Sequence, residues 1–123
     1  MGKVVIIGTG TMGVGIAAGF LAYGTDTVIL GRTEEKAQAC LEAVAACTSA
    51  INTEWQKLGA KLLAGSISKW NDWEETDLVI ETISERLDLK QAIFADLDQR
   101  VPSHVPIGSN SSGFPISFGG SDG

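Results

Sequence analysis

The segment KVVIIGTGTMG, residues 3–13, is the strongest indication of the fold of this chain. After Lys3 its opening residues are apolar and β-branched without interruption, which is typical of a strand buried on both faces of a parallel sheet. The next residues fit the pattern G-x-G-x-x-G, and from Met12 apolar residues recur at helical spacing until Gly24 supplies a stop. The stretch therefore predicts a strand, a glycine turn and a helix in direct succession.

The glycine turn is the first candidate site. Free backbone N–H groups and the helix dipole at the start of a helix favour a pyrophosphate. In this pattern Gly8 permits the tight turn, Gly10 lets the backbone approach a phosphate, and Gly13 lets the helix pack close to the strand. The alternative is a sharp turn without a ligand, but the place of the motif between a strand and a helix favours a dinucleotide site. We include Thr11 and Met12 among its candidate residues.

Strands and helices alternate along the rest of the chain. The apolar spacing from Glu34 to Leu63 keeps a helical period, which predicts either one long helix or a helical hairpin. Alternation of this kind argues for an α/β fold with a doubly wound, mostly parallel sheet of the Rossmann type, whose ligands lie at the carboxyl ends of the strands. The other expected elements are strands at 27–30, 66–68, 77–81 and 105–108 and a helix that contains Leu89 and Val101.

Composition narrows the range of functions. The chain has 123 residues, about the size of one domain, and carries a net charge of −6 without any basic cluster. Nucleic acid and an anionic membrane are therefore disfavoured as partners. The apolar stretches are far shorter than the ~20 residues that span a bilayer, and the start lacks a signal peptide, so we expect a cytoplasmic protein. Cys40 and Cys47 lie in a helical segment where both can face the core, and their spacing indicates no metal site.

The end of the predicted second strand bears on the choice of cofactor. An Asp or Glu about 20 residues after the glycines takes the ribose hydroxyls of NAD, but here the position is Gly31. Glycine removes the repulsion that a carboxylate exerts on a 2′-phosphate, Arg32 adds a positive charge and Thr33 adds a hydroxyl, with Lys36 nearby. The combination favours NADP over NAD; the alternative is that Arg32 stacks on the adenine of either cofactor.

Three motifs occur in a fixed order along the chain. They are VIIGTGTMGVG at 5–15, DLVIE at 77–81 followed by Glu85 and Leu89-Lys90, and NSS at 110–112 followed by PIS at 115–117. Together they resemble the amino-terminal domain of the 3-hydroxyacyl-CoA dehydrogenases of fatty acid metabolism. The resemblance covers almost the whole chain, and it implies an oxidoreductase that transfers hydride between NAD(P)(H) and a 3-hydroxyacyl or 3-ketoacyl substrate.

The resemblance also implies roles for single residues. Glu85 and Lys90 match residues that contact the nicotinamide end of the cofactor, Asn110 belongs to the cofactor site, and Ser112 matches a serine that meets the acyl substrate near its reacting oxygen. The catalytic histidine of the family follows the Asn-Ser-Ser segment and has no match in this sequence. His104 precedes that segment, and we interpret it as an exposed loop residue.

These patterns lead to one expected organisation and three candidate functions. We expect a dinucleotide-binding domain at 1–118 and a frayed tail at 119–123, with the family's carboxyl-terminal helical domain absent and the isolated chain inactive. The complete enzyme would act on an acyl-CoA or an acyl-carrier substrate and could form a homo-oligomer. The alternatives are a stand-alone nucleotide-binding module without catalysis and an NADP-dependent reductase of another short hydroxy acid.

Overall fold

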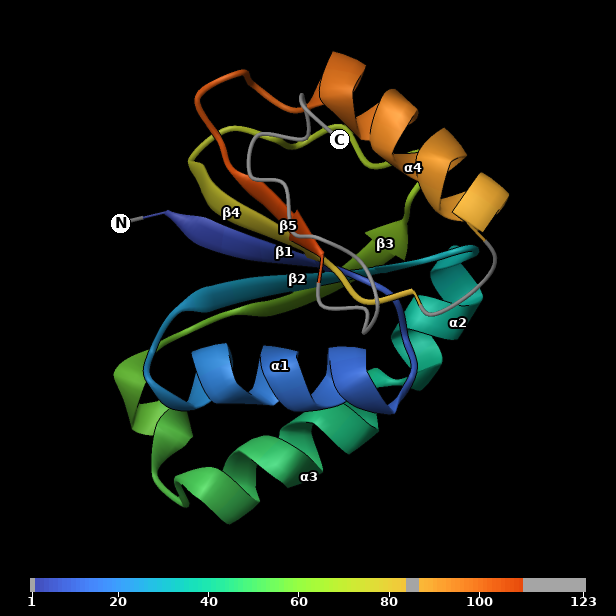
Figure 1. Ribbon diagram of the computed structural model, residues 1–123. Helices are drawn as coiled ribbons and strands as arrows, with labels where there is room; N and C mark the ends of the chain where they lie inside the picture. The colour runs from blue at the N-terminus through green and yellow to red at the C-terminus, as the bar shows by residue number, and fades with distance from the viewer. Residues whose placement is uncertain (1, 84–86, 110–123) are drawn as a thin grey trace.

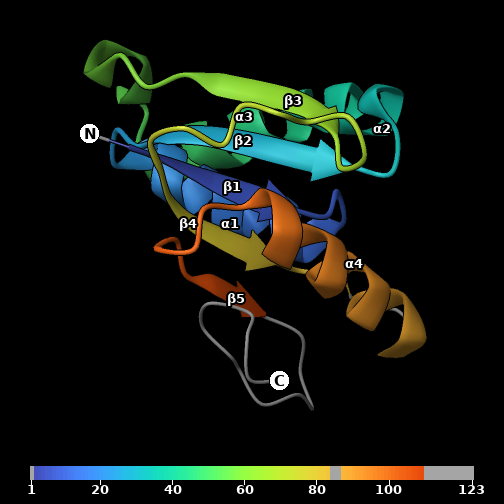
Figure 2. The same ribbon diagram turned by 90° about the horizontal axis from the view of Figure 1, so that it is seen from above.

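The computed structural model describes residues 2–83 and 87–109, without the side chains of 87–90 and 109. In this part of the chain five parallel strands form one sheet in the order β3-β2-β1-β4-β5 (Figure 2). Helices cover both faces of the sheet (Figure 1), as expected for a doubly wound fold. The elements are β1 (Lys3–Ile7), α1 (Thr11–Ala22), β2 (Asp26–Gly31), α2 (Glu34–Ala39), α3 (Leu41–Ile51), the 3-10 helix η1 (Trp55–Leu58), β3 (Leu62–Ser66), β4 (Thr76–Glu81), α4 (Leu87–Arg100) and β5 (Ile107–Ser109).

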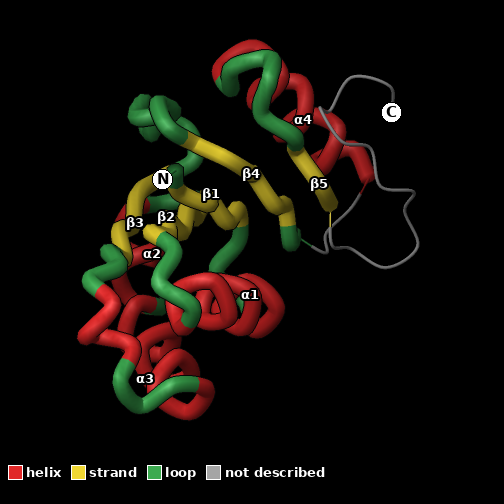
Figure 3. Tube along the Cα trace, turned by 90° about the vertical axis from the view of Figure 1, so that its left-hand side faces the viewer, coloured by secondary structure: helices red, strands yellow, loops and turns green. Residues whose placement is uncertain are grey.

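The central strand β1 supplies side chains to two separate cores. Val5 and Ile7 pack in the core that contains Leu97 of α4, whereas Val4 and Ile6 pack on the other face with α1. Figure 3 shows α4 on one side of the sheet and α1, α2 and α3 on the other. Since full burial of a Val or Ile side chain contributes about 1.5–3 kcal/mol, two covered faces explain why this strand is apolar at successive positions.

The segment after β2 differs in part from the prediction. The extra helices are present, as α2 and α3, which meet at Cys40. The expectation that the helical region extends to Leu63 is wrong, because helix α3 ends at Ile51. The strand expected at 66–68 lies earlier, over Leu62–Ser66. Its backbone pairs with β2 along its whole length, and this pairing overrides the helical spacing of its apolar side chains.

The two cysteines have different surroundings. The Cys40 thiol is half-buried and donates a hydrogen bond to the carbonyl oxygen of Ala37 at 3.1 Å, and burial raises the pKa of this thiol. Cys47 is exposed, so the expectation that both cysteines face the core is wrong. Helix α3 packs on α1, and the position turned inward is Thr48, whose hydroxyl donates to the carbonyl oxygen of Val44 at 2.7 Å.

Among the helices described above, none is both long enough and apolar enough to span a bilayer.

Candidate functional site

A cleft of about 410 Å³ opens at the carboxyl ends of the central strands. Strand β1 pairs with β2 on one side and with β4 on the other, so the chain connections leave this end of the sheet in opposite directions. In open α/β sheets, ligands bind at such a switch point. The residues that line the cleft are Gly8, Thr9 and Gly10 after β1, Gly31, Arg32 and Lys36 after β2, Ile67 after β3, and Thr82 and Ile83 after β4.

The three glycines of the turn have different environments. Gly8 has a φ of +125°, and a Cβ atom on it would lie 2.3 Å from the hydroxyl oxygen of Thr82. A Cβ atom on Gly13 would lie 2.3 Å from the carbonyl oxygen of Gly8, so α1 can approach β1 only because this position lacks a side chain. A Cβ atom on Gly10 would meet no atom within 4 Å. The space above Gly10 is therefore open.

The amino terminus of α1 suits an anion. Its N-cap residue, Gly10, makes no side-chain hydrogen bond, and the first turn holds no acidic residue. The nearby helix α2 is different, because Thr33 caps it and Glu34 and Glu35 occupy its first turn. Helix α1 thus presents uncapped N–H groups and the positive end of its dipole to the cleft without a competing carboxylate. These features fit a pyrophosphate, with the N–H groups of the first turn as donors.

Thr82 is a residue of the cleft that the sequence motifs did not indicate. Its hydroxyl and its backbone N–H both donate to the carbonyl oxygen of Ile7, each at 2.9 Å. These bonds join the carboxyl ends of β1 and β4 next to the glycine turn. The Thr82 hydroxyl lies so close to Gly8 that a Cβ atom on Gly8 would clash with it. The residue follows the strand at 77–81 immediately, so the rule that ligands lie beyond the carboxyl ends of strands could have identified it.

Replacement of Thr82 by valine should lower the free energy of unfolding by about 1 kcal/mol. Valine keeps the shape of the side chain but removes the hydroxyl, while the backbone N–H still donates to Ile7. Urea unfolding followed by circular dichroism measures the difference. Thr82→Ser, which retains the hydroxyl, is the matched control, and its free energy of unfolding should lie closer to that of the unaltered chain. A valine variant as stable as the unaltered chain would contradict this role of the hydroxyl.

The end of β2 forms the opposite wall of the cleft. Gly31 is buried, and a Cβ atom on it would lie 2.8 Å from the methyl carbon of Thr9. Arg32 and Lys36 are exposed and line the cleft together. Thr33 does not line it; the Thr33 hydroxyl accepts a hydrogen bond from the N–H of Lys36 at 3.1 Å and faces an adjoining hollow. Two cationic side chains thus line this wall of the cleft.

The remaining candidate residues are only partly covered by the structure. Glu85, Asn110 and Ser112 lie outside the described residues, as does the tail at 119–123. Lys90 lies in α4, and its side chain is not described. Thr11 and Met12 begin α1 beside the cleft and are exposed. His104 is exposed in the turn before β5, which confirms its interpretation as a loop residue. Among the residues described, no cluster of His, Cys, Asp or Glu side chains could hold a metal ion.

Relatives of this chain are found by sequence and by structure. Residues 3–118 match the family described as the 3-hydroxyacyl-CoA dehydrogenase NAD-binding domain. A peroxisomal fatty acid beta-oxidation multifunctional protein of Oryza sativa subsp. japonica is 34% identical over 117 residues, which are 89% of this chain and 16% of that protein. An L-carnitine dehydrogenase of Streptomyces griseus is 31% identical, over 93% of this chain and 35% of the enzyme.

A solved structure has the same fold. The (S)-3-hydroxybutyryl-CoA dehydrogenase of Ralstonia eutropha superposes with a TM-score of 0.77 at 28% identity, covering 91% of this chain and 41% of that enzyme. The chain thus spans less than half of the length of each of these relatives. Because the family match runs through every strand and helix described here, the chain belongs to the family of NAD-binding domains of 3-hydroxyacyl-CoA dehydrogenases.

Proposed function

We propose that this chain is the cofactor-binding part of an oxidoreductase that interconverts 3-hydroxyacyl and 3-ketoacyl substrates. The observation that carries the proposal is the uncapped amino terminus of α1 beside the open space above Gly10, at the switch point of the sheet. A nicotinamide dinucleotide held at this site would supply or accept the hydride. The chain's own part is to hold the pyrophosphate on the N–H groups of α1 and to separate the two ends of the dinucleotide, with Thr82 on one side and Arg32 on the other.

The substrate class is supported by the relatives. The Ralstonia eutropha neighbour is named for 3-hydroxybutyryl-CoA, and the rice relative for fatty acid beta-oxidation. An acyl-CoA or acyl-carrier substrate would meet Ser112 in the complete enzyme. A second candidate is a dehydrogenase of a small hydroxy acid, which the similarity to L-carnitine dehydrogenase favours. Assays of acetoacetyl-CoA and of 3-dehydrocarnitine with a longer form of the protein would separate the two candidates.

We also propose that the site prefers NADP to NAD. Gly31 brings no carboxylate to the end of β2, and Arg32 and Lys36 both line the cleft beside it. One charge-assisted contact with a phosphate is worth about 1.5–3 kcal/mol, which corresponds to about 10–100-fold in affinity. We therefore expect the dissociation constant of NADPH to be lower than that of NADH by about that factor. Fluorescence or calorimetric titration of both cofactors measures it directly.

A carboxylate at position 31 should reverse this order. Because a Cβ atom there would lie 2.8 Å from the methyl carbon of Thr9, Gly31→Asp is best made together with Thr9→Ser, which removes that methyl group. Thr9→Ser alone is the matched control and should retain the preference for NADPH. Binding of NADH that equals or exceeds binding of NADPH in the unaltered chain would exclude the NADP proposal while leaving the dinucleotide site intact.

A further inference from the structure

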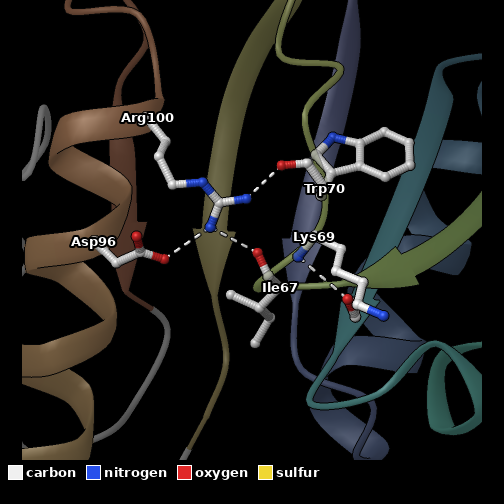
Figure 4. Close-up of polar contacts among 6 residues, drawn as sticks. Ile67, Lys69, Trp70, Asp96 and Arg100 are labelled. Atoms are coloured by element: carbon white, nitrogen blue, oxygen red, sulfur yellow. Dashed lines mark hydrogen bonds and ion pairs between the residues drawn. The ribbon is translucent and has the colours of Figure 1, made fainter.

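Arg100 joins the last turn of α4 to the turn that follows β3 (Figure 4). One terminal nitrogen of its guanidinium donates to the carbonyl oxygen of Ile67 at 2.7 Å, and the other donates to the carbonyl oxygen of Trp70. The first nitrogen also lies 2.7 Å from a carboxylate oxygen of Asp96, one helical turn earlier in α4. The guanidinium carbon lies 5.6 Å from the centre of the buried Trp73 ring. The Arg100 side chain is only 23% exposed, so its bonds to the two carbonyl groups are partly shielded from water, whereas Asp96 is 47% exposed.

The turn that Arg100 holds, Ser66–Trp70, belongs to the wall of the cleft. Ile67 lines the cleft together with Gly31 and Arg32. The turn is closed internally, because the N–H of Trp70 donates to the carbonyl oxygen of Ser66 at 2.9 Å. On the cleft side the N–H of Ile67 donates to the carbonyl oxygen of Gly31, also at 2.9 Å. Ile67 is therefore fixed through its N–H to the end of β2 and through its carbonyl group to α4.

We infer that Arg100 is a positioning residue for the adenosine end of the cofactor. It does not line the cleft itself and acts through Ile67, which lines the cleft beside the end of β2 and whose side chain packs in the core under it. A planar guanidinium can donate to two carbonyl groups of one turn and to a carboxylate at the same time, which a lysine ammonium cannot do with the same geometry. The inference rests on the proposed function, since it assigns the β2 side of the cleft to the adenosine.

The test compares two halves of the cofactor. ADP-ribose requires the β2 side of the cleft, whereas reduced nicotinamide mononucleotide requires the β4 side, where Thr82 lies. Both dissociation constants can be measured by NMR titration of the isotopically labelled 123-residue chain. Arg100→Met should raise the dissociation constant of ADP-ribose by about tenfold and change that of the mononucleotide by less than about twofold. Arg100→Lys should raise the first constant by less than Arg100→Met does, and the exposed neighbour Gln99→Met is the control.

Each outcome bears on the inference. Unchanged affinity for ADP-ribose in a folded Arg100→Met chain would overturn it, and so would an equal loss of affinity for both ligands, which indicates a merely structural role. If Arg100→Met does not fold, Arg100→Lys decides, and unchanged affinity for ADP-ribose in that variant overturns the inference. If the unaltered chain binds neither ADP-ribose nor the mononucleotide, and neither NADH nor NADPH, the proposed function is overturned together with the inference. A loss of affinity that is confined to ADP-ribose in the Arg100 variants supports both the proposed function and the inference.

Discussion

Replacing Gly10 by valine is expected to leave the chain folded and to weaken the binding of both NADH and NADPH by about 100-fold. A Cβ atom on Gly10 would meet no protein atom within 4 Å, so the substitution has no neighbour to displace. It would instead occupy the space through which a pyrophosphate reaches the N–H groups of α1. Each charge-assisted hydrogen bond lost there costs about 1.5–3 kcal/mol, and this loss is the same for both cofactors because they share the pyrophosphate.

The matched comparison is Gly13→Val. Gly13 lies close to Gly10 in the sequence, but a side chain there is expected to act on folding and not on cofactor binding. A Cβ atom there would lie 2.3 Å from the carbonyl oxygen of Gly8, which is backbone and cannot rotate away. We therefore expect Gly13→Val to lower the unfolding temperature, whereas Gly10→Val should leave it near that of the unaltered chain. Circular dichroism melting and cofactor titration distinguish the two effects. A folded Gly10→Val chain with unchanged affinity for both cofactors would refute the proposed site.

The second large effect concerns turnover. The 123-residue chain is expected to bind NADPH and yet to reduce acetoacetyl-CoA at a rate about 10²–10⁴ below that of an ordinary enzyme, because the histidine that the family resemblance implies as acid–base group has no match in its sequence. Its sequence contains one histidine, His104, which is exposed in the turn before β5. Lost positioning of the acyl group should lower the rate further. A steady-state assay, run on the preparation used for cofactor titration, measures this rate.

The opposite result would change the assignment of the catalytic group. Turnover near 10 s⁻¹, on the order of a typical enzyme, would show that an effective acid–base group lies within these residues. His104→Ala would then be the first variant to assay, with Ser103→Ala as the neighbouring control. Binding without turnover is also what a non-catalytic nucleotide-binding module would show. A longer form of the protein separates that alternative, since only an oxidoreductase gains activity when the acyl-binding part is added.

Much of the fold could be predicted because it depends on short-range patterns. The run of apolar residues at 3–7 needs two covered faces, and the glycines that follow it need a turn with little room for side chains, whatever the rest of the chain does. The positions of Gly8, Gly10 and Gly31 at one cleft follow from the rule that parallel strands end at the same edge of the sheet. Neighbouring residues in the sequence were sufficient for these conclusions.

The failures arose where distant partners decide the structure. The apolar spacing up to Leu63 is helical, yet Leu62–Ser66 is a strand because β2 offers its backbone groups as partners. The contact at the end of β2 is likewise absent from the sequence pattern, since only the fold brings the methyl carbon of Thr9 to 2.8 Å from where a Cβ atom on Gly31 would lie. Neither contact leaves a periodic signal, since each depends on how two separate segments are placed.

The parallel α/β class, the glycine turn and the side of the sheet on which the site lies follow from local patterns of residues, because local spacing and strand direction are enough for each. The bond of Thr82 to the carbonyl group of Ile7 and the bond of Arg100 to the turn containing Ile67 depend instead on how distant segments pack. These hydrogen bonds join residues 75 and 33 positions apart in the sequence. Their geometry exists only once hydrophobic burial has brought the strands and α4 together, because a hydrogen bond requires its donor and acceptor to lie within about 3 Å.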